Sequence, residues 1–280
     1  KSVVEAYSNW IDALSEKKKD LPSYYQSAAE VNIAGCRSAK DRMLAGLRIL
    51  SEDQVAWSAF SLANRAMFMQ RVHLKLQSDT ADKDRYPGDE SLTKLLEAVD
   101  YSVSDGITGD NYFWRLFQIA FLLMSIESVT NDSAPDRDIV DLIWFPTGGG
   151  KTEAYLGLTA FAIFYRRLAH SSDSDGTTVI MRYTLRLLAA QQFTRASTLI
   201  CACEYIRSDA VSRRPKYRKY PLGNSEITIG LWIGSKHIPN TNADAKKHLK
   251  ELTDARVDNL QYAKEQHNQF QVLKCPWCGT

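Results

Sequence analysis

The residues best suited to chemistry form a glycine-rich stretch in the middle of the chain, Pro146-Thr-Gly-Gly-Gly-Lys-Thr152. Glycines let the backbone bend so that several N–H groups face one point, and a helix starting there adds partial positive charge. Lys151 can then reach the β- and γ-phosphates of a nucleotide, and the Thr152 hydroxyl can bind Mg²⁺. The predicted site binds ATP and Mg²⁺ through Pro146, Thr147, Gly148, Gly149, Gly150, Lys151, Thr152 and Glu153.

Two features of this stretch have plainer interpretations. The strict phosphate-loop pattern fails at its first position, where Phe145 stands, and the glycines could simply close a turn. Glu153 falls in the first turn of the predicted helix, where a carboxylate is favourable whether or not a ligand binds. The Pro-Thr-Gly-x-Gly-Lys-Thr variant of superfamily 2 helicases is nevertheless matched in full.

A glutamine upstream of the loop is a candidate base reader. Arg115-x-x-Gln118 resembles the Arg-x-x-Gln motif that superfamily 2 helicases carry before the phosphate loop. An amide both donates and accepts hydrogen bonds, which suits the adenine edge. The resemblance implies that Gln118, with Arg115, recognises adenine. The alternative is a polar residue on a buried helix that bonds only to backbone.

Two further segments carry candidate contacts to DNA. Arg182-Tyr-Thr-Leu-Arg186 and the following residues resemble helicase motif Ia, although Gln191 comes one place late and Tyr183 replaces proline. Hydroxyl, guanidinium and helix-start N–H groups hold phosphates without reading sequence. A strand ending at Gly234 would let backbone approach a phosphate. The residues predicted to line the DNA path are Arg182, Thr184, Arg186, Gln191 and Gly234; a capped helix with a charged face is the alternative.

A basic loop follows, in which aromatic residues alternate with positive charge. Arg213, Arg214, Lys216, Arg218 and Lys219 lie beside Tyr217 and Tyr220. Cations beside aromatic rings suit phosphate contacts combined with base stacking. A solvated loop without a ligand is the competing interpretation.

Cys275-Pro-Trp-Cys278 near the end of the sequence has the form of a zinc knuckle. Its tight turn lets two thiolates converge on one ion, but Zn²⁺ prefers four ligands, so the pair predicts half of a Zn²⁺ site. A redox-active dithiol is the alternative. Cys36, Cys201 and Cys203 are interpreted as small core residues.

The elements that would position these residues alternate in type after a helical front. Residues 1–77 have helical spacing, interrupted near Pro22. Short apolar runs at 139–145, 177–183 and 227–233 predict strands, and 151–170, 185–207 and 242–268 predict helices. Strands alternating with helices favour an α/β fold, a RecA-like parallel sheet preceded by a helical domain. The predicted ranges are 1–110 helical, 111–270 ATP-binding, and 271–280 the start of a zinc knuckle.

The composition of the chain limits its class. With 280 residues, 44% of them hydrophobic and 24% charged, it is neither disordered nor too small for a core. A net charge of +2 confines nucleic-acid binding to local patches. No apolar run is long enough to span a bilayer, so no membrane partner is expected. Five cysteines without a framework spacing favour a reducing compartment.

Taken together, the motifs resemble the helicase subunit of the DISARM bacterial phage-defence system, over residues 57–280. The resemblance implies an ATP-driven helicase or translocase in the bacterial cytoplasm. Its implied partners are DNA, single-stranded or with an overhang, and a second defence subunit. No acidic box follows the loop to hold Mg²⁺ and orient water, so the sequence is expected to be part of a longer chain. A regulatory NTPase that gates a protein partner, or a scaffold without turnover, are the alternatives.

Overall fold

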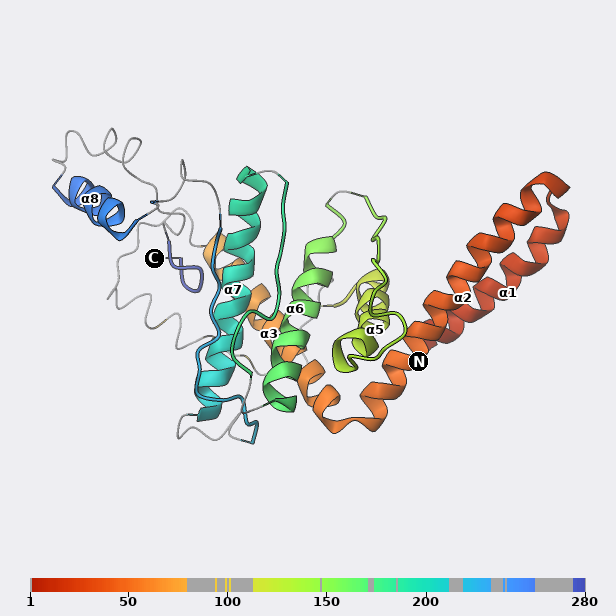
Figure 1. Cartoon of the computed structure of the whole chain (residues 1–280), viewed down its shortest axis with the longest axis horizontal. Helices are drawn as coiled ribbons and strands as arrows, with labels where there is room; N and C mark the ends of the chain where they lie inside the picture. Colours follow the sequence, from red (N-terminus) through yellow and green to blue (C-terminus); the bar gives the residue numbers. More distant parts are fainter. Residues whose placement is uncertain are drawn as a thin grey trace. The chain divides into compact units, whose positions relative to one another are not determined.

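The structure is a computed structural model, and every regular element in the part of the chain that it describes is a helix (Figure 1). It describes residues 2–79, 94, 99, 101, 113–146, 148–170, 174–184, 186–211, 219–232, 239, 241–254 and 274–279. The α-helices are α1 (Ser2–Lys17), α2 (Ser23–Glu52), α3 (Gln54–Asp79), α5 (Leu116–Thr130), α6 (Lys151–Ala169), α7 (Arg186–Val211) and α8 (Asn242–Thr253), with a 3₁₀ turn η1 (Lys18–Asp20).

The predicted α/β fold with a RecA-like parallel sheet is wrong for this structure. Within the described residues, no strand forms at 139–145, 177–183 or 227–232; these segments have no regular secondary structure. Apolar and β-branched side chains favour an extended backbone, but a strand exists only where a neighbouring segment accepts and donates the ladder hydrogen bonds. The sequence pattern therefore indicated a local preference for an extended backbone, but it did not indicate whether a neighbouring strand was present.

Several large apolar side chains of these segments are exposed. Val140, Leu142 and Trp144 are 93%, 81% and 90% exposed, and Trp232 is 98% exposed. The alternate residues Asp141 and Ile143 are half-buried. The segment before the glycine loop therefore keeps the two-residue periodicity of a strand, with one side against the helices.

Contacts divide the chain into two compact units, of which the first holds the glycine loop. It comprises Lys1–Arg71, Tyr101–Ile180 and Ala202–Glu226. The predicted break near Pro22 is confirmed, since α1 ends at Lys17 and α2 begins at Ser23, and the two helices pack side by side (Figure 1). Asp53 separates α2 from α3, and its carboxylate accepts hydrogen bonds from the N–H groups of Val55 and Ala56.

Close packing of α2 on α5 forms the core beneath the loop. A Cβ on Gly46 of α2 would lie 2.1 Å from the carbonyl oxygen of Leu123 in α5, so only glycine permits this approach. Leu122 and Ile126 of α5 are buried, as is Phe161 of α6. Because α5 packs on both α2 and α6, it connects the helical front to the helix that begins at the loop.

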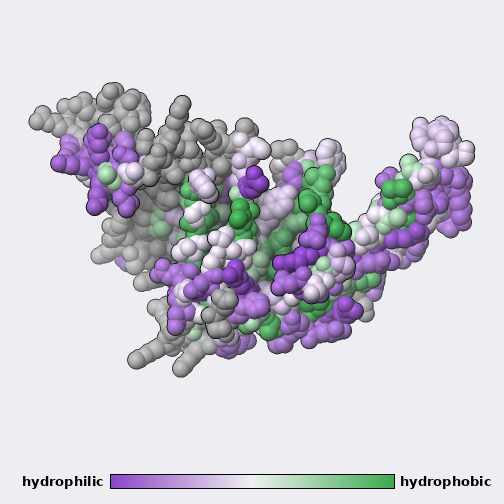
Figure 2. Space-filling view, viewed as in Figure 1, coloured by the Kyte–Doolittle hydropathy of each residue, from purple (hydrophilic) through white to green (hydrophobic). Residues whose placement is uncertain are grey.

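The second unit comprises Val72–Asp100, Met181–Cys201 and Ile227–Thr280. Its helix α8 begins at a predicted position, where the Thr241 hydroxyl accepts a hydrogen bond from the Asp244 N–H at 3.1 Å. The visible surface of α8 is mostly hydrophilic (Figure 2), and no residue of this helix is buried. Among the described helices, none combines the length and apolar character needed to cross a membrane.

Candidate functional site

The glycine loop is a sharp turn that leads directly into α6. Gly148 and Gly150 have φ values of +80° and +91°, in the left-handed region that favours glycine. The Gly149 N–H bonds to the Pro146 carbonyl at 3.1 Å, which closes the turn. Lys151, Thr152 and Glu153 form the first turn of α6, whose leading N–H groups have no acceptor within the helix. This end of α6 places N–H donors where the helix adds partial positive charge, as an anion site requires.

Each glycine of the loop meets different surroundings. A Cβ on Gly148 would meet nothing within 4 Å, so this side of the turn is open. A Cβ on Gly149 would lie 2.4 Å from the Phe145 ring, and one on Gly150 would lie 2.8 Å from Nε2 of Gln118. The loop is therefore packed against protein on one side and accessible on the other.

The Arg115-x-x-Gln118 motif lies against this loop. Arg115 donates from a guanidinium nitrogen to the Gly149 carbonyl at 2.7 Å, and Gln118 donates from Nε2 to the Gly150 carbonyl at 2.7 Å. The Oε1 of Gln118 accepts from the Arg115 N–H at 2.8 Å, which caps α5. Gln118 is only 4% exposed, yet its amide bridges the start of α5 and the start of α6. The structure thus brings together two motifs that are distant in the sequence.

The Lys151 ammonium contacts carbonyls of the loop at the position proposed for a phosphate. Its ammonium donates to the carbonyl of Phe145 at 2.5 Å and to that of Pro146 at 3.2 Å. Phosphate oxygens bind an ammonium more strongly than neutral carbonyls do, because both partners are then charged. A phosphate group at the loop would therefore compete with these two carbonyls for the Lys151 ammonium.

Aromatic residues that the sequence analysis did not single out support this arrangement. Phe145 stacks on Phe117 with ring centroids 4.1 Å apart. Trp114 donates from its indole nitrogen to Oδ1 of Asn64 in α3 at 2.6 Å, and its ring packs where a Cβ on Gly157 of α6 would stand. The adjoining Arg115 is thereby fixed to both α3 and α6. The position of Trp114 directly before the Arg115-x-x-Gln118 motif was the sequence feature that could have indicated this supporting role.

The residues predicted to contact DNA are only partly described. Arg182 and Thr184 are exposed in the second unit, as is Gln191 in α7. In the first unit, the Lys219 ammonium lies 5.0 Å from the centre of the Tyr220 ring. Of these residues, the ones outside the described part of the chain are Arg213, Arg214, Lys216, Arg218, Gly234 and the side chain of Arg186; Thr147, predicted to bind the nucleotide, also lies outside it. The structure therefore does not test a shared path along these residues.

The Cys275–Cys278 turn packs within the second unit. Gly279 has φ +82°, and its N–H bonds to the Cys275 carbonyl at 2.9 Å. Burial raises the pKa of Cys275, whereas N–H groups of Cys278 and Trp277 directed at its sulfur lower the pKa. Burial also raises the pKa of Cys201, with further contributions from the nearby Cys275 and Cys278. In the described part of the chain, no three or more His, Cys, Asp or Glu side chains form a group suited to a metal ion.

Two helices hold this turn in place. The side chains of Gln77 in α3 and Thr198 in α7 donate to the Pro276 carbonyl at 2.6 and 2.8 Å. His73 of α3 stacks on Trp277 with ring centroids 3.4 Å apart, and its Nδ1 lies 2.6 Å from the Trp277 carbonyl. Because a carbonyl can only accept, Nδ1 carries the proton. Burial lowers the pKa of His73.

Comparison with known proteins identifies a relative. No family model matches the chain. The DISARM protein DrmA of Bacillus paralicheniformis (strain ATCC 9945a / NCIMB 11709 / CD-2) is 34% identical over 289 aligned residues, which cover 100% of this chain. The chain is a relative of a DISARM component. The predicted resemblance to DISARM is therefore confirmed, while the word helicase is not part of the relative's name. This DISARM relative is much longer, and the chain spans 22% of its length.

Proposed function

We propose that this chain binds ATP at the glycine loop and is the ATP-binding part of a DISARM motor that moves on DNA. One observation carries the proposal: the Arg115-x-x-Gln118 motif contacts the carbonyls of Gly149 and Gly150 directly. A glycine turn that merely joins two elements needs no such contact from a distant motif. The DISARM relationship supports the wider role in phage defence.

Each group of residues would contact a different part of the nucleotide or of the DNA, according to its chemistry. The N–H groups at the start of α6 and the Lys151 ammonium would hold the β- and γ-phosphates. The Thr152 hydroxyl would bind Mg²⁺, which lowers the charge repulsion between phosphates. Gln118 and Arg115, which contact the loop, would recognise adenine. Arg182, Thr184 and Gln191 would contact DNA phosphates without reading sequence.

The test is ATP binding and hydrolysis by the full-length protein, with and without single-stranded DNA. Lys151→Ala should abolish ATP binding or hydrolysis and leave the melting temperature unchanged, because the ammonium acts on the phosphates rather than on the core. Lys246→Ala is the matched control, since this lysine lies on the exposed helix α8.

The outcomes separate the candidate functions. Unchanged ATPase activity in Lys151→Ala would refute the phosphate-loop assignment. ATP turnover that DNA leaves unaltered would instead support a regulatory NTPase that controls a protein partner. Binding without any turnover in the full-length protein would support a scaffold.

A further inference from the structure

We propose that the ion pair between Arg42 of α2 and Asp141 positions the glycine loop for phosphate binding. Resting on the proposed function, this inference adds a pair of positioning residues outside the loop. The two residues are far apart in the sequence, and the sequence analysis used neither of them.

The pair has the geometry of a strong, oriented contact. The two terminal guanidinium nitrogens of Arg42 lie 2.6 and 2.7 Å from the two carboxylate oxygens of Asp141. One of them also donates to the Met124 carbonyl of α5 at 3.3 Å. Arg42 is 8% exposed, so the pair is largely shielded from water. One guanidinium thus ties α2, α5 and the segment before the loop together.

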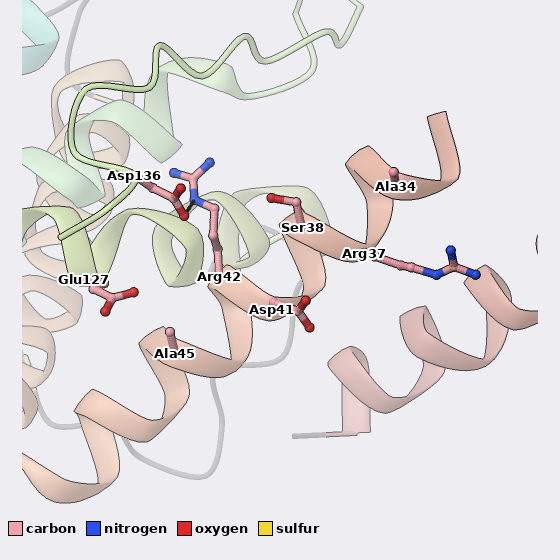
Figure 3. A pocket seen from close by; sticks show the side chains of 8 residues that line it. All are labelled: Ala34, Arg37, Ser38, Asp41, Arg42, Ala45, Glu127 and Asp136. Carbon is pink, nitrogen blue, oxygen red and sulfur yellow. Dashed lines mark ion pairs between the residues drawn. The ribbon is translucent and has the colours of Figure 1, made fainter. Parts of the chain in front are cut away.

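The surroundings direct Arg42 toward this segment. Its Nε lies 3.5 Å from Oδ2 of Asp136, at the edge of a pocket of about 480 Å³ that Glu127 also lines (Figure 3). The nearby Arg37 points away from Arg42, and its guanidinium contacts Ser15 of α1 and Glu30 instead (Figure 3). Carboxylates therefore surround Arg42, and Asp141 makes the bidentate contact.

The position of Asp141 fixes the register of the segment. Asp141 faces the helices while Val140 and Leu142 face outward, and Phe145 is stacked on Phe117 farther along. A shift of one residue would bring an apolar side chain to Arg42 and remove its bidentate partner. The ion pair and the aromatic stack are thus two anchors on one short stretch of chain.

This register sets the geometry of the loop that follows. The carbonyls of Phe145 and Pro146 contact the Lys151 ammonium, so a displaced segment moves the groups around the phosphate position. A misplacement of about 1 Å can lower a rate by about 10²-fold even when the substitution is remote. Arg42 and Asp141 are therefore expected to affect ATP binding and hydrolysis without touching the nucleotide.

The experiment compares Asp141→Asn and Arg42→Lys in the full-length protein with a matched control. Glu204→Gln is that control, because Arg207 makes a similarly buried bidentate pair with Glu204 at 2.5 and 2.7 Å. Arg207 otherwise donates to the carbonyls of Gly223 and Asn224, not to the segment before the loop. Hydrogen exchange of peptides covering 139–151, ATP affinity and the melting temperature are measured for each variant.

Both test variants should exchange faster over 139–151 and bind ATP about tenfold or more weakly, as expected for a displaced phosphate site. Glu204→Gln should match the wild type in hydrogen exchange over 139–151 and in ATP affinity, even if its melting temperature falls as much as that of the two test variants. Wild-type exchange and ATP affinity in Asp141→Asn and Arg42→Lys, with Lys151→Ala inactive, would overturn this inference alone. A wild-type protein that does not bind ATP would overturn the proposed function, and the inference with it.

Discussion

Gln118 is the residue on which the candidate site depends most, because its amide joins two helices through the loop. Gln118→Ala removes the donor to the Gly150 carbonyl and the acceptor for the Arg115 N–H. Leaving such buried groups unpaired should lower the free energy of unfolding by about 1–3 kcal/mol. The preference for ATP over GTP should fall by about tenfold, the equivalent of about 1.4 kcal/mol. Urea denaturation and competition binding measure the two effects.

Ser125→Ala is the control for this substitution. Ser125 is a buried polar residue of the same helix, and its hydroxyl donates to the Phe121 carbonyl at 2.8 Å. This variant should leave nucleotide preference unchanged. If Gln118→Ala also keeps the preference and affinity of the wild type, Gln118 is only a structural residue of α5.

His73 is expected to make the stability of the folded chain depend on pH, because its ring stacks on Trp277 of the Cys275–Cys278 turn in a buried position. Burial lowers the pKa of His73 in the folded chain, so the folded state resists protonation. The unfolded chain binds a proton as the pH falls through about 6.5, and folding stability then decreases by at most about 1.4 kcal/mol per pH unit. The contribution of His73 to the free energy of unfolding should therefore be fully present above that pH and decrease progressively as the pH falls below it. Thermal unfolding at several pH values between 8 and 5 measures the slope.

His73→Asn should reduce this pH dependence, since its amide can still donate to the Trp277 carbonyl but does not titrate in this range. His170→Asn is the control, because His170 is exposed at the end of α6. An identical slope in His73→Asn and the wild type would show that other groups cause the acid sensitivity.

Local sequence predicted the loop residues but not their supports. The glycines, Lys151 and Thr152 are adjacent in the chain, so their spacing alone indicates a phosphate site. Trp114, Arg42 and Asp141 act through contacts with residues far away in the sequence, which no spacing rule reveals. Nucleotide and zinc binding stay predictions.

At the scale of elements, α2 approaches α5 closely, and α5 in turn packs on the helix that begins at the loop. Gly46→Ala places a Cβ 2.1 Å from the Leu123 carbonyl oxygen, so the helices must separate. Overpacking of this kind costs about 1–3 kcal/mol, more than the gain in helix propensity of about 1 kcal/mol. Urea denaturation of the chain should show a clear net loss of stability.

Gly35→Ala provides the contrast within the same helix. A Cβ on Gly35 meets nothing within 4 Å, so alanine brings its helix propensity without a clash. The expected result is a gain of up to about 1 kcal/mol. Equal effects of the two substitutions would contradict the close approach of α2 and α5.

Helices were predictable and strands were not, for one physical reason. The i to i+4 hydrogen bonds of α6 and α7 lie within the segment, so periodicity and end signals suffice to place them. The apolar runs at 139–145 and 177–183 needed ladder partners elsewhere in the chain to become strands, and neither run forms a strand among the described residues. An apolar run of this length therefore specifies an extended backbone and nothing about a sheet.

At the scale of the whole molecule, this chain corresponds to 22% of the length of its DISARM relative. The chain alone should bind ATP weakly and hydrolyse almost none, because it carries no acidic box or arginine finger. The finger alone contributes about 10³–10⁵ in rate in related chemistry. Zinc should be absent or weakly held, since two thiolates supply only half of a tetrahedral site.

Single-turnover hydrolysis and zinc content of residues 1–280 test these expectations together. Robust turnover would mean that a general base lies within these residues, and it would contradict the expected lack of hydrolysis. One tightly bound zinc per chain would mean that Cys275 and Cys278 find their remaining ligands here.

The two hydrogen bonds of Gln118 also remove an ambiguity that usually attends amide side chains. Rotating the amide by 180° would set a donor against the Arg115 N–H and an acceptor against the Gly150 carbonyl, so only one orientation is tolerated. The second hydrogen on Nε2 and the second lone pair on Oε1 of Gln118 therefore have known directions. Adenine offers a donor and an acceptor side by side on one edge and matches this pair. On the same edge guanine offers two acceptors. The fixed amide of Gln118 would therefore distinguish adenine from guanine without any movement of the protein.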